Sequence, residues 1–282
     1  MIPYLQEPTV RIGSVTLHAF GAFVATAVFV GCWIILRRAE QQSRDRETMT
    51  HLLLWVLGCG FLVSHLEHLT FAESWMFARP LVALSQPALL LNLWGGMSAL
   101  GGMVGGVLGG VLFMRRKGWP WGEMLAHLEM IAFASPFAWS IARAGCALAH
   151  DHPGVHTMSW LAVRYPDGPR FDLGLIDFFC VLSLAGLFLF LDRHTRPRGF
   201  YFVLFLLLYG SERLLLDNLR DEERFLGLTS GQYGAGVAVL LGLFALCMMT
   251  ASCSRRSGNV VPDGRNPERT VPAPRRASKT LG

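Results

Sequence analysis

A dense group of polar residues follows a long apolar stretch near the middle of the chain. Arg143 comes at the end of about twenty largely apolar residues, and Cys146, His150, Asp151 and His152 follow it closely. An arginine inside a membrane span costs about 2.5–3.5 kcal/mol at mid-bilayer, so chains usually retain it where it faces a polar cavity or an anion. Histidines beside a carboxylate can exchange protons near neutral pH. Other polar features fall on the same side of the membrane, so we favour a functional site here, with histidines for either acid–base chemistry or metal binding, over the plainer alternative, a snorkelling arginine followed by a polar loop.

A second polar set lies in the last third of the chain. Tyr209, Arg213, Asp217 and Arg220 follow one another in steps of four, four and three residues. This spacing puts all four side chains on one face of a helix. An Arg–Asp pair alone would be structural, but a whole polar stripe at the end of an apolar helix indicates the wall of a cavity.

The composition predicts what must position these residues. Hydrophobic residues make up 52% of the chain, charged residues make up 16%, and the mean hydropathy is +0.40. Apolar runs near twenty residues recur, which is typical of an all-α membrane protein. We predict seven transmembrane helices, at residues 15–36, 49–71, 91–114, 121–141, 173–191, 200–216 and 232–251. The start of the chain lacks a signal-peptide pattern, so we expect the first helix to be retained.

Positive charge is concentrated in the connections after the odd-numbered spans and after the last span. Most of the 25 Lys and Arg residues fall there, which places the N-terminus outside and the C-terminus in the cytoplasm. This distribution also explains the net charge of +5 without nucleic acid as a partner. The Arg143 segment and the end of the sixth span then share the outer side, where residues 142–172 form a small outward-facing head.

The remaining features concern packing and boundaries. Glycine pairs that begin at Gly101, Gly105 and Gly109 predict close approach of another helix, within one chain or between two. The six cysteines show no CxxC pair and indicate neither a disulfide framework nor a zinc site. We expect a membrane domain at residues 1–251 and a disordered cytoplasmic tail at 252–282, which is rich in Pro, Arg and Ser.

The histidines of the chain suggest an alternative function, that of a metal-dependent enzyme. His65, Glu67 and His68 close the second span and could join His150, Asp151 and His152 around an ion. Two histidines at such spacing are weak evidence without a third ligand, so we predict no metal and no cofactor.

The polar segments form an ordered series of motifs. Trp94-Gly-Gly-Met-Ser98 precedes Gly101-Gly102, and Arg143-Ala-Gly145 is followed by Asp151 and Gly154. Arg196-Pro-Arg-Gly199 then precedes the Tyr209 to Arg220 stripe. In this order, from about residue 13 to 243, the chain resembles the prolipoprotein diacylglyceryl transferase family.

The resemblance implies a seven-helix bundle in the bacterial cytoplasmic (inner) membrane, surrounded by membrane lipids. It implies transfer of a diacylglyceryl group from phosphatidylglycerol to the lipobox cysteine of prolipoprotein signal peptides, with release of glycerol phosphate. Arg143, with Gly154, would belong to the lipid-phosphate site, because a guanidinium matches phosphate with two charge-assisted bonds. Arg213 and Arg220 would hold charge on the leaving group, oriented by Asp217 and Tyr209.

The chain departs from the family pattern at several motif positions. Leu100 stands where the family has its third-helix histidine, taken as the catalytic base, Phe20 replaces a tyrosine, and Cys146 replaces the signature asparagine. Residues 171–176 replace a His-Pro-x-Gln-Leu-Tyr stretch. We hypothesise that His150 or His152, beside Asp151, has taken over the role of the base. The alternative is a non-catalytic relative that binds phospholipid or a partner.

Overall fold

The computed structural model describes residues 1–13, 15–71, 97–221, 224 and 226–258. Two predicted features lie outside this part: residues 94–96 of the motif before the third span, and residues 259–282 of the predicted tail. Residues 1–246 form one compact unit, and residues 247–282 belong to a second.

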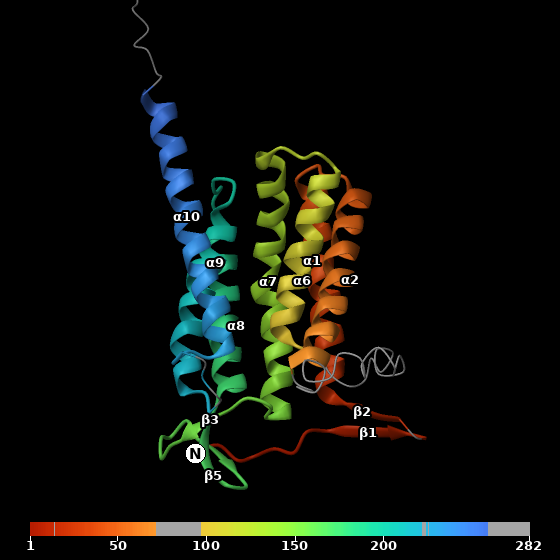
Figure 1. Ribbon diagram of the computed structural model, residues 1–282, viewed down its shortest axis with the longest axis vertical. Coiled ribbons are helices and arrows are strands. Elements are labelled where there is room, and N and C mark those ends of the chain that lie inside the picture. Colours follow the sequence, from red (N-terminus) through yellow and green to blue (C-terminus); the bar gives the residue numbers. More distant parts are fainter. Residues whose placement is uncertain (14, 72–96, 222–223, 225, 259–282) are drawn as a thin grey trace, which may run out of the picture. The chain divides into compact units, whose positions relative to one another are not determined.

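Long helices dominate the part of the chain that the structure describes (Figure 1). They are α1 (Ala19–Gln41), α2 (Arg46–Phe71), α6 (Ala99–Arg116), α7 (Trp121–Ala149), α8 (Leu173–Leu191), α9 (Phe200–Leu216) and α10 (Ser230–Gly258). Five of them, namely α1, α2, α7, α8 and α10, are long and apolar enough to cross a membrane. The helices α6 and α9 have 18 and 17 residues. This is a helical, multi-pass membrane protein, and the number of seven spans stays a prediction.

Several predicted boundaries were wrong. The third helix was predicted from residue 91, but Ser98 is extended and its side chain caps α6, which begins at Ala99. Residues 15–18 do not begin the first helix, because β2 (Val15–His18) pairs antiparallel with β1 (Thr9–Ile12) across a turn in which Gly13 has a φ of 61°. The fourth helix does not end at residue 141 but continues to Ala149 through an alanine-rich stretch that favours helix. The last helix continues past Ala251 to Gly258, with no Pro or Gly between them to end it.

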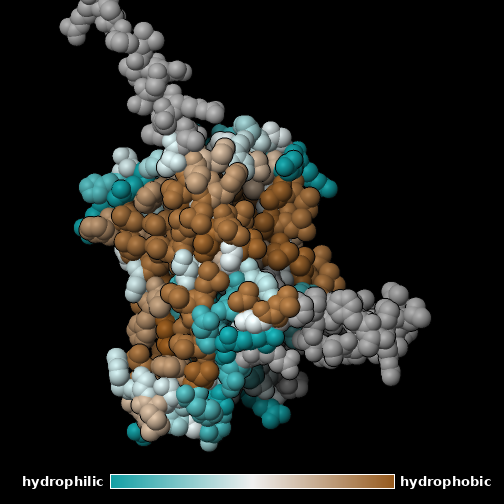
Figure 2. All heavy atoms as spheres, turned by 60° about the vertical axis from the view of Figure 1, so that its left-hand side comes forward, coloured by the Kyte–Doolittle hydropathy of each residue, from teal (hydrophilic) through white to brown (hydrophobic). Residues whose placement is uncertain are grey.

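Large apolar side chains lie on the outside of the bundle. Phe29, Leu54, Val107, Phe190 and Leu240 are each more than half exposed. Figure 2 shows hydrophobic residues in a broad band across one face, with hydrophilic residues gathered toward its upper and lower ends. Such an apolar outer surface matches a lipid solvent.

The glycine pairs of α6 pack against α2 of the same chain. This confirms that they allow a close helix contact, and it shows that the contact lies within one chain. A β-carbon on Gly105 would lie 2.3 Å from the carbonyl oxygen of Cys59, and one on Gly109 would lie 2.4 Å from that of Trp55. These glycines therefore allow the two helix backbones to approach each other.

Gly105→Ala should lower stability by about 1–3 kcal/mol, because the added methyl group forces two backbones apart. Thermal unfolding in detergent would measure the loss. Gly106→Ala is the matched control, since its β-carbon would lie 3.5 Å from Val56 Cγ1, an ordinary contact. Equal melting temperatures for the two variants would contradict the packing argument.

A small head joins the ends of three helices. It consists of β3 (Pro153–His156), β4 (Val163–Tyr165) and β5 (Gly168–Asp172), with β5 in the middle of an antiparallel sheet. It follows α7 and precedes α8, and Gly154 pairs with Arg220, just after the short 3-10 helix η1 (Asp217–Leu219) that continues α9. The chain start contributes a further bridge from Ile2 to Val163. The head thus lies at the end of the bundle where α7 and α9 finish and α8 begins.

Candidate active site

Two buried arginines share one carboxylate at the head end of the bundle. Arg143 Nε lies 2.6 Å from Asp177 Oδ2, and Arg213 Nη1 donates to the same oxygen at 3.1 Å. Both arginine side chains are 10% exposed, and the Asp177 side chain is 1% exposed. The cluster connects α7, α8 and α9, since each helix contributes one of these residues. A guanidinium has five N–H donors, more than a shared carboxylate can accept, so the pair can also bind an oxyanion.

Three of the four residues in the polar stripe lie in or beside this cluster, namely Tyr209, Arg213 and Asp217. The Arg213 guanidinium pairs with Asp217, whose other oxygen accepts a hydrogen bond of 3.0 Å from the Thr229 hydroxyl. A β-carbon on Gly231 would lie 2.1 Å from Asp217 Oδ2, so α10 approaches the carboxylate closely. Asp217 is fully buried. It therefore holds Arg213 in one orientation.

Tyr209 connects the stripe to α7. Trp139 Nε1 donates to the Tyr209 hydroxyl at 2.7 Å, and the Arg143 guanidinium carbon lies 5.5 Å from the centre of the Trp139 ring. The fourth residue of the stripe, Arg220, lies beyond η1 in extended backbone. Arg220 therefore does not continue the helical stripe. It is connected to the site by the backbone bridge that it forms with Gly154.

His152 faces Arg143. Its Nε2 lies 3.4 Å from Arg143 Nη1, and its Nδ1 lies 2.5 Å from Asp151 Oδ1. A carboxylate on one imidazole nitrogen fixes the tautomer and orients the other nitrogen. The Asp151–His152 pair is therefore arranged for proton transfer beside the arginines.

His150 makes different contacts, within the head. Its Nδ1 lies 2.5 Å from Asp172 Oδ2, its Nε2 lies 3.0 Å from the carbonyl oxygen of Leu5, and its ring stacks on Tyr4. His150 also ends α7 in the left-handed conformation, with a φ of 52°. Both ring nitrogens thus have partners that tie the head to the chain start, so the structure brings His152, but not His150, to Arg143.

Asp172 is the centre of this head contact. Its Oδ1 accepts from the Leu175 backbone N–H at 3.0 Å and caps α8, while Oδ2 accepts from the Tyr165 hydroxyl at 3.1 Å. Burial and the neighbouring carboxylate raise the pKa of Tyr165 well above its usual range, so this hydroxyl remains a donor. The start of α8, and with it Asp177, is thereby fixed relative to the head.

The six residues of the metal-dependent alternative do not come together among the residues that the structure describes. Ligand atoms of Cys146, Asp151 and His152 lie within 4.8 Å of one another, whereas His150 pairs with Asp172. Arg143 Nη1 lies 3.5 Å from Cys146 Sγ and 3.4 Å from His152 Nε2. A fixed positive charge at this position opposes a metal ion and favours an anion.

Sequence reasoning missed Asp177, Thr229 and Asp172. Asp177 had a usable signal, because it is an acidic residue inside the apolar run 173–191, where an ionisable group is expensive and usually functional. Thr229 and Asp172 had none, since isolated polar residues beside a helix start are ordinary caps.

A family model for prolipoprotein diacylglyceryl transferase matches residues 8–248. The chain belongs to this family. A phosphatidylglycerol–prolipoprotein diacylglyceryl transferase of Geobacter sulfurreducens is 28% identical over 268 residues, which cover 90% of this chain and 97% of the relative. Enzymes of the same name from Symbiobacterium thermophilum and Bacillus cereus are 21% and 23% identical, over 87% and 80% of this chain and 93% and 85% of theirs. Arg143, Arg213 and Asp217, which the resemblance made candidate site residues, lie in the buried cluster.

Proposed function

We propose that this protein transfers the diacylglyceryl group of phosphatidylglycerol to the lipobox cysteine thiol of prolipoproteins. The observation that carries the proposal is the pair of buried arginines, Arg143 and Arg213, around Asp177 at the head end of a membrane bundle. Guanidinium groups held rigidly in a low-dielectric site stabilise charge that develops on a departing phosphate. Membership of the family and the names of its relatives support the same substrates.

In this proposal Arg143 binds the lipid phosphate, with Gly154 bringing the head backbone close. A β-carbon on Gly154 would lie 2.9 Å from the Leu219 carbonyl oxygen, so a side chain there would push the head away from Arg220. Arg213 and Arg220 hold charge on the leaving glycerol phosphate. Asp217 is the positioning residue for Arg213, and Tyr209 is the positioning residue for the Trp139 ring.

Both histidines were hypothesised as the catalytic base; we keep only His152, with Asp151, as an acid–base residue and change its role from base to acid. It neighbours Arg143 and therefore the proposed phosphate, so we assign it the transfer of a proton to the departing phosphate oxygen. Asp151 stabilises the protonated imidazole in this step. No metal and no cofactor take part.

The membrane arrangement that we propose has seven spans in the bacterial cytoplasmic membrane, with the N-terminus and the head outside. Two ion pairs support it. Arg38 binds Asp192 through two hydrogen bonds of 2.9 Å, and Arg44 pairs with Glu123. These contacts gather the basic connections after α1 and α8, and the start of α7, at the end of the bundle opposite the head. The positive-inside rule assigns that end to the cytoplasm.

The test is lipidation of a lipobox reporter in a strain depleted of its own transferase, with this protein supplied. Mass spectrometry should detect an added diacylglyceryl group with the wild-type chain. Arg143→Ala should lower the yield by about 100-fold or more, because a charged contact made in the transition state is lost. A folded, membrane-inserted wild-type protein that adds no mass to the reporter would exclude the transferase function and favour a phospholipid-binding relative.

A further inference from the structure

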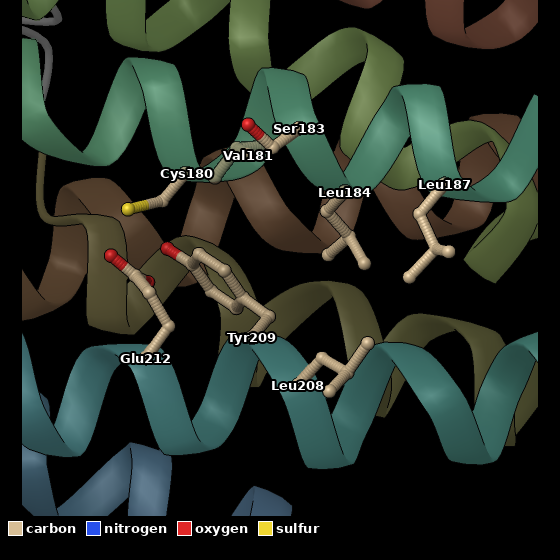
Figure 3. Close-up of a pocket in the computed structure, with 8 residues that line it drawn as sticks. All are labelled: Cys180, Val181, Ser183, Leu184, Leu187, Leu208, Tyr209 and Glu212. Atoms are coloured by element: carbon tan, nitrogen blue, oxygen red, sulfur yellow. The ribbon is translucent and has the colours of Figure 1, made fainter.

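A cavity lies between α8 and α9 beside the arginine cluster (Figure 3). Its volume is about 230 Å³, enough for a side chain of cysteine size. Cys180, Tyr209 and Glu212 line one end, and Leu184, Leu187 and Leu208 line the other. Glu212 and Cys180 have no role in the proposed function.

Glu212 is the unexplained group in this cavity. Both of its carboxyl oxygens are buried, and neither has a hydrogen-bond partner among the residues that the structure describes. A buried carboxyl group without a partner costs several kcal/mol in an apolar environment, and such groups are rare unless they serve a ligand or a reaction. In Figure 3 the carboxyl group points across the cavity toward α8, near the Cys180 thiol and the Tyr209 hydroxyl.

The cavity lies farther from the head than the phosphate cluster does. The head contacts the start of α8 and the end of α9, so residues later in α8 or earlier in α9 lie farther from it. Cys180 is one turn beyond Asp177 in α8, and Tyr209 is one turn before Arg213 in α9. Glu212 directly precedes Arg213. A lipid whose phosphate contacts Arg143 and Arg213 would thus extend its glyceryl group toward this cavity.

The proposed reaction needs a base on that side. Diacylglyceryl transfer to sulfur replaces a carbon–oxygen bond at a saturated carbon, so the thiol must approach from the side opposite the departing phosphate. His152 contacts Arg143 and so lies on the phosphate side. A carboxylate oxygen free of hydrogen bonds is available to accept a proton, and Glu212 is such a group in the cavity toward which the glyceryl group would extend.

Resting on the proposed function, we infer that Glu212 is the general base that receives the proton of the acceptor cysteine. The sulfur forms a bond to the terminal glyceryl carbon while the bond from that carbon to the phosphate oxygen breaks. The departing oxygen keeps the electron pair and takes a proton from His152, while the thiol proton goes to Glu212. The products are a thioether and glycerol phosphate, and no oxidant or other reactant is needed.

The experiment compares two acceptor peptides, one with the lipobox cysteine and one with selenocysteine in its place. A selenol is ionised at neutral pH and requires no base. Purified wild-type protein and Glu212→Gln are assayed with phosphatidylglycerol in mixed micelles, and phospholipid bound to each protein is measured separately. Glutamine keeps the size of the side chain but does not accept a proton.

Glu212→Gln should transfer to the cysteine peptide about 100-fold more slowly than the wild type, the usual contribution of a general base. Its rate with the selenocysteine peptide and its bound phospholipid should stay close to those of the wild type. Ser183→Ala is the control in the same cavity, because the Ser183 hydroxyl already bonds to the Phe179 carbonyl oxygen of its own helix at 2.8 Å. This variant should keep the wild-type rate with both peptides.

Two results would overturn the inference and leave the proposed function intact: an undiminished cysteine rate in Glu212→Gln, or equal losses with both peptides, which indicate a structural role. A wild-type protein that binds phospholipid but modifies neither peptide would overturn the proposed function, and this inference with it.

Discussion

Asp177→Ala should lower the free energy of unfolding by about 3–5 kcal/mol, the cost of removing one partner from a buried ion pair. The Asp177 side chain is 1% exposed, and its Oδ2 contacts Arg143 Nε at 2.6 Å and Arg213 Nη1 at 3.1 Å. Without it two guanidinium groups remain in a low-dielectric region with less neutralising charge between them. We also expect the lipid-transfer activity to fall to background, because Arg143 loses its carboxylate partner and Arg213 keeps only Asp217.

Thermal unfolding in detergent, monitored together with reporter lipidation, would measure both effects. Asp177→Asn is the informative companion, since it keeps the shape and one acceptor oxygen but removes the charge. Its stability should lie between those of the wild type and Asp177→Ala. If Asp177→Ala unfolded at the wild-type temperature, the buried cluster would not connect α7, α8 and α9 in the way described here.

The histidines should separate into a catalytic and a structural residue. His152→Ala should lower the transfer rate by about 100-fold, a typical loss for an acid–base group, with little change in melting temperature. The reason is that His152 contacts Asp151, itself 37% exposed, and Arg143 at the site. Its loss leaves the protein core intact.

His150→Ala should show the reverse pattern. His150 contacts Asp172, Leu5 and Tyr4, so its loss should loosen the head and the chain start and lower the melting temperature. The rate per folded molecule should fall much less than in His152→Ala. Rates and melting temperatures of the two purified variants would decide the assignment, and a larger catalytic loss in His150→Ala would reverse it.

Hydrophobic runs and charge spacing made the helical class and most helix positions predictable, because a bilayer requires long apolar segments. Helix ends were less predictable. The alanine-rich continuation of α7 carries Arg143 on a helix, and β1–β2 occupies the start of the predicted first span. Both boundaries depend on local pairing and capping, which hydropathy does not record.

For the site, the residues themselves made Arg143, Arg213, Asp217 and the two histidines His150 and His152 the candidates, because charged groups are costly in an apolar chain and their spacing puts them on helix faces. Only the tertiary structure decided which of them meet. In the folded chain both arginines contact Asp177, and His150 contacts Asp172. The Glu212 oxygens lie in a cavity and have no hydrogen-bond partner among the described residues. The physical reason is that such contacts join α7, α8, α9 and the head, and the packing of separate helices is not encoded in the periodicity of any one of them.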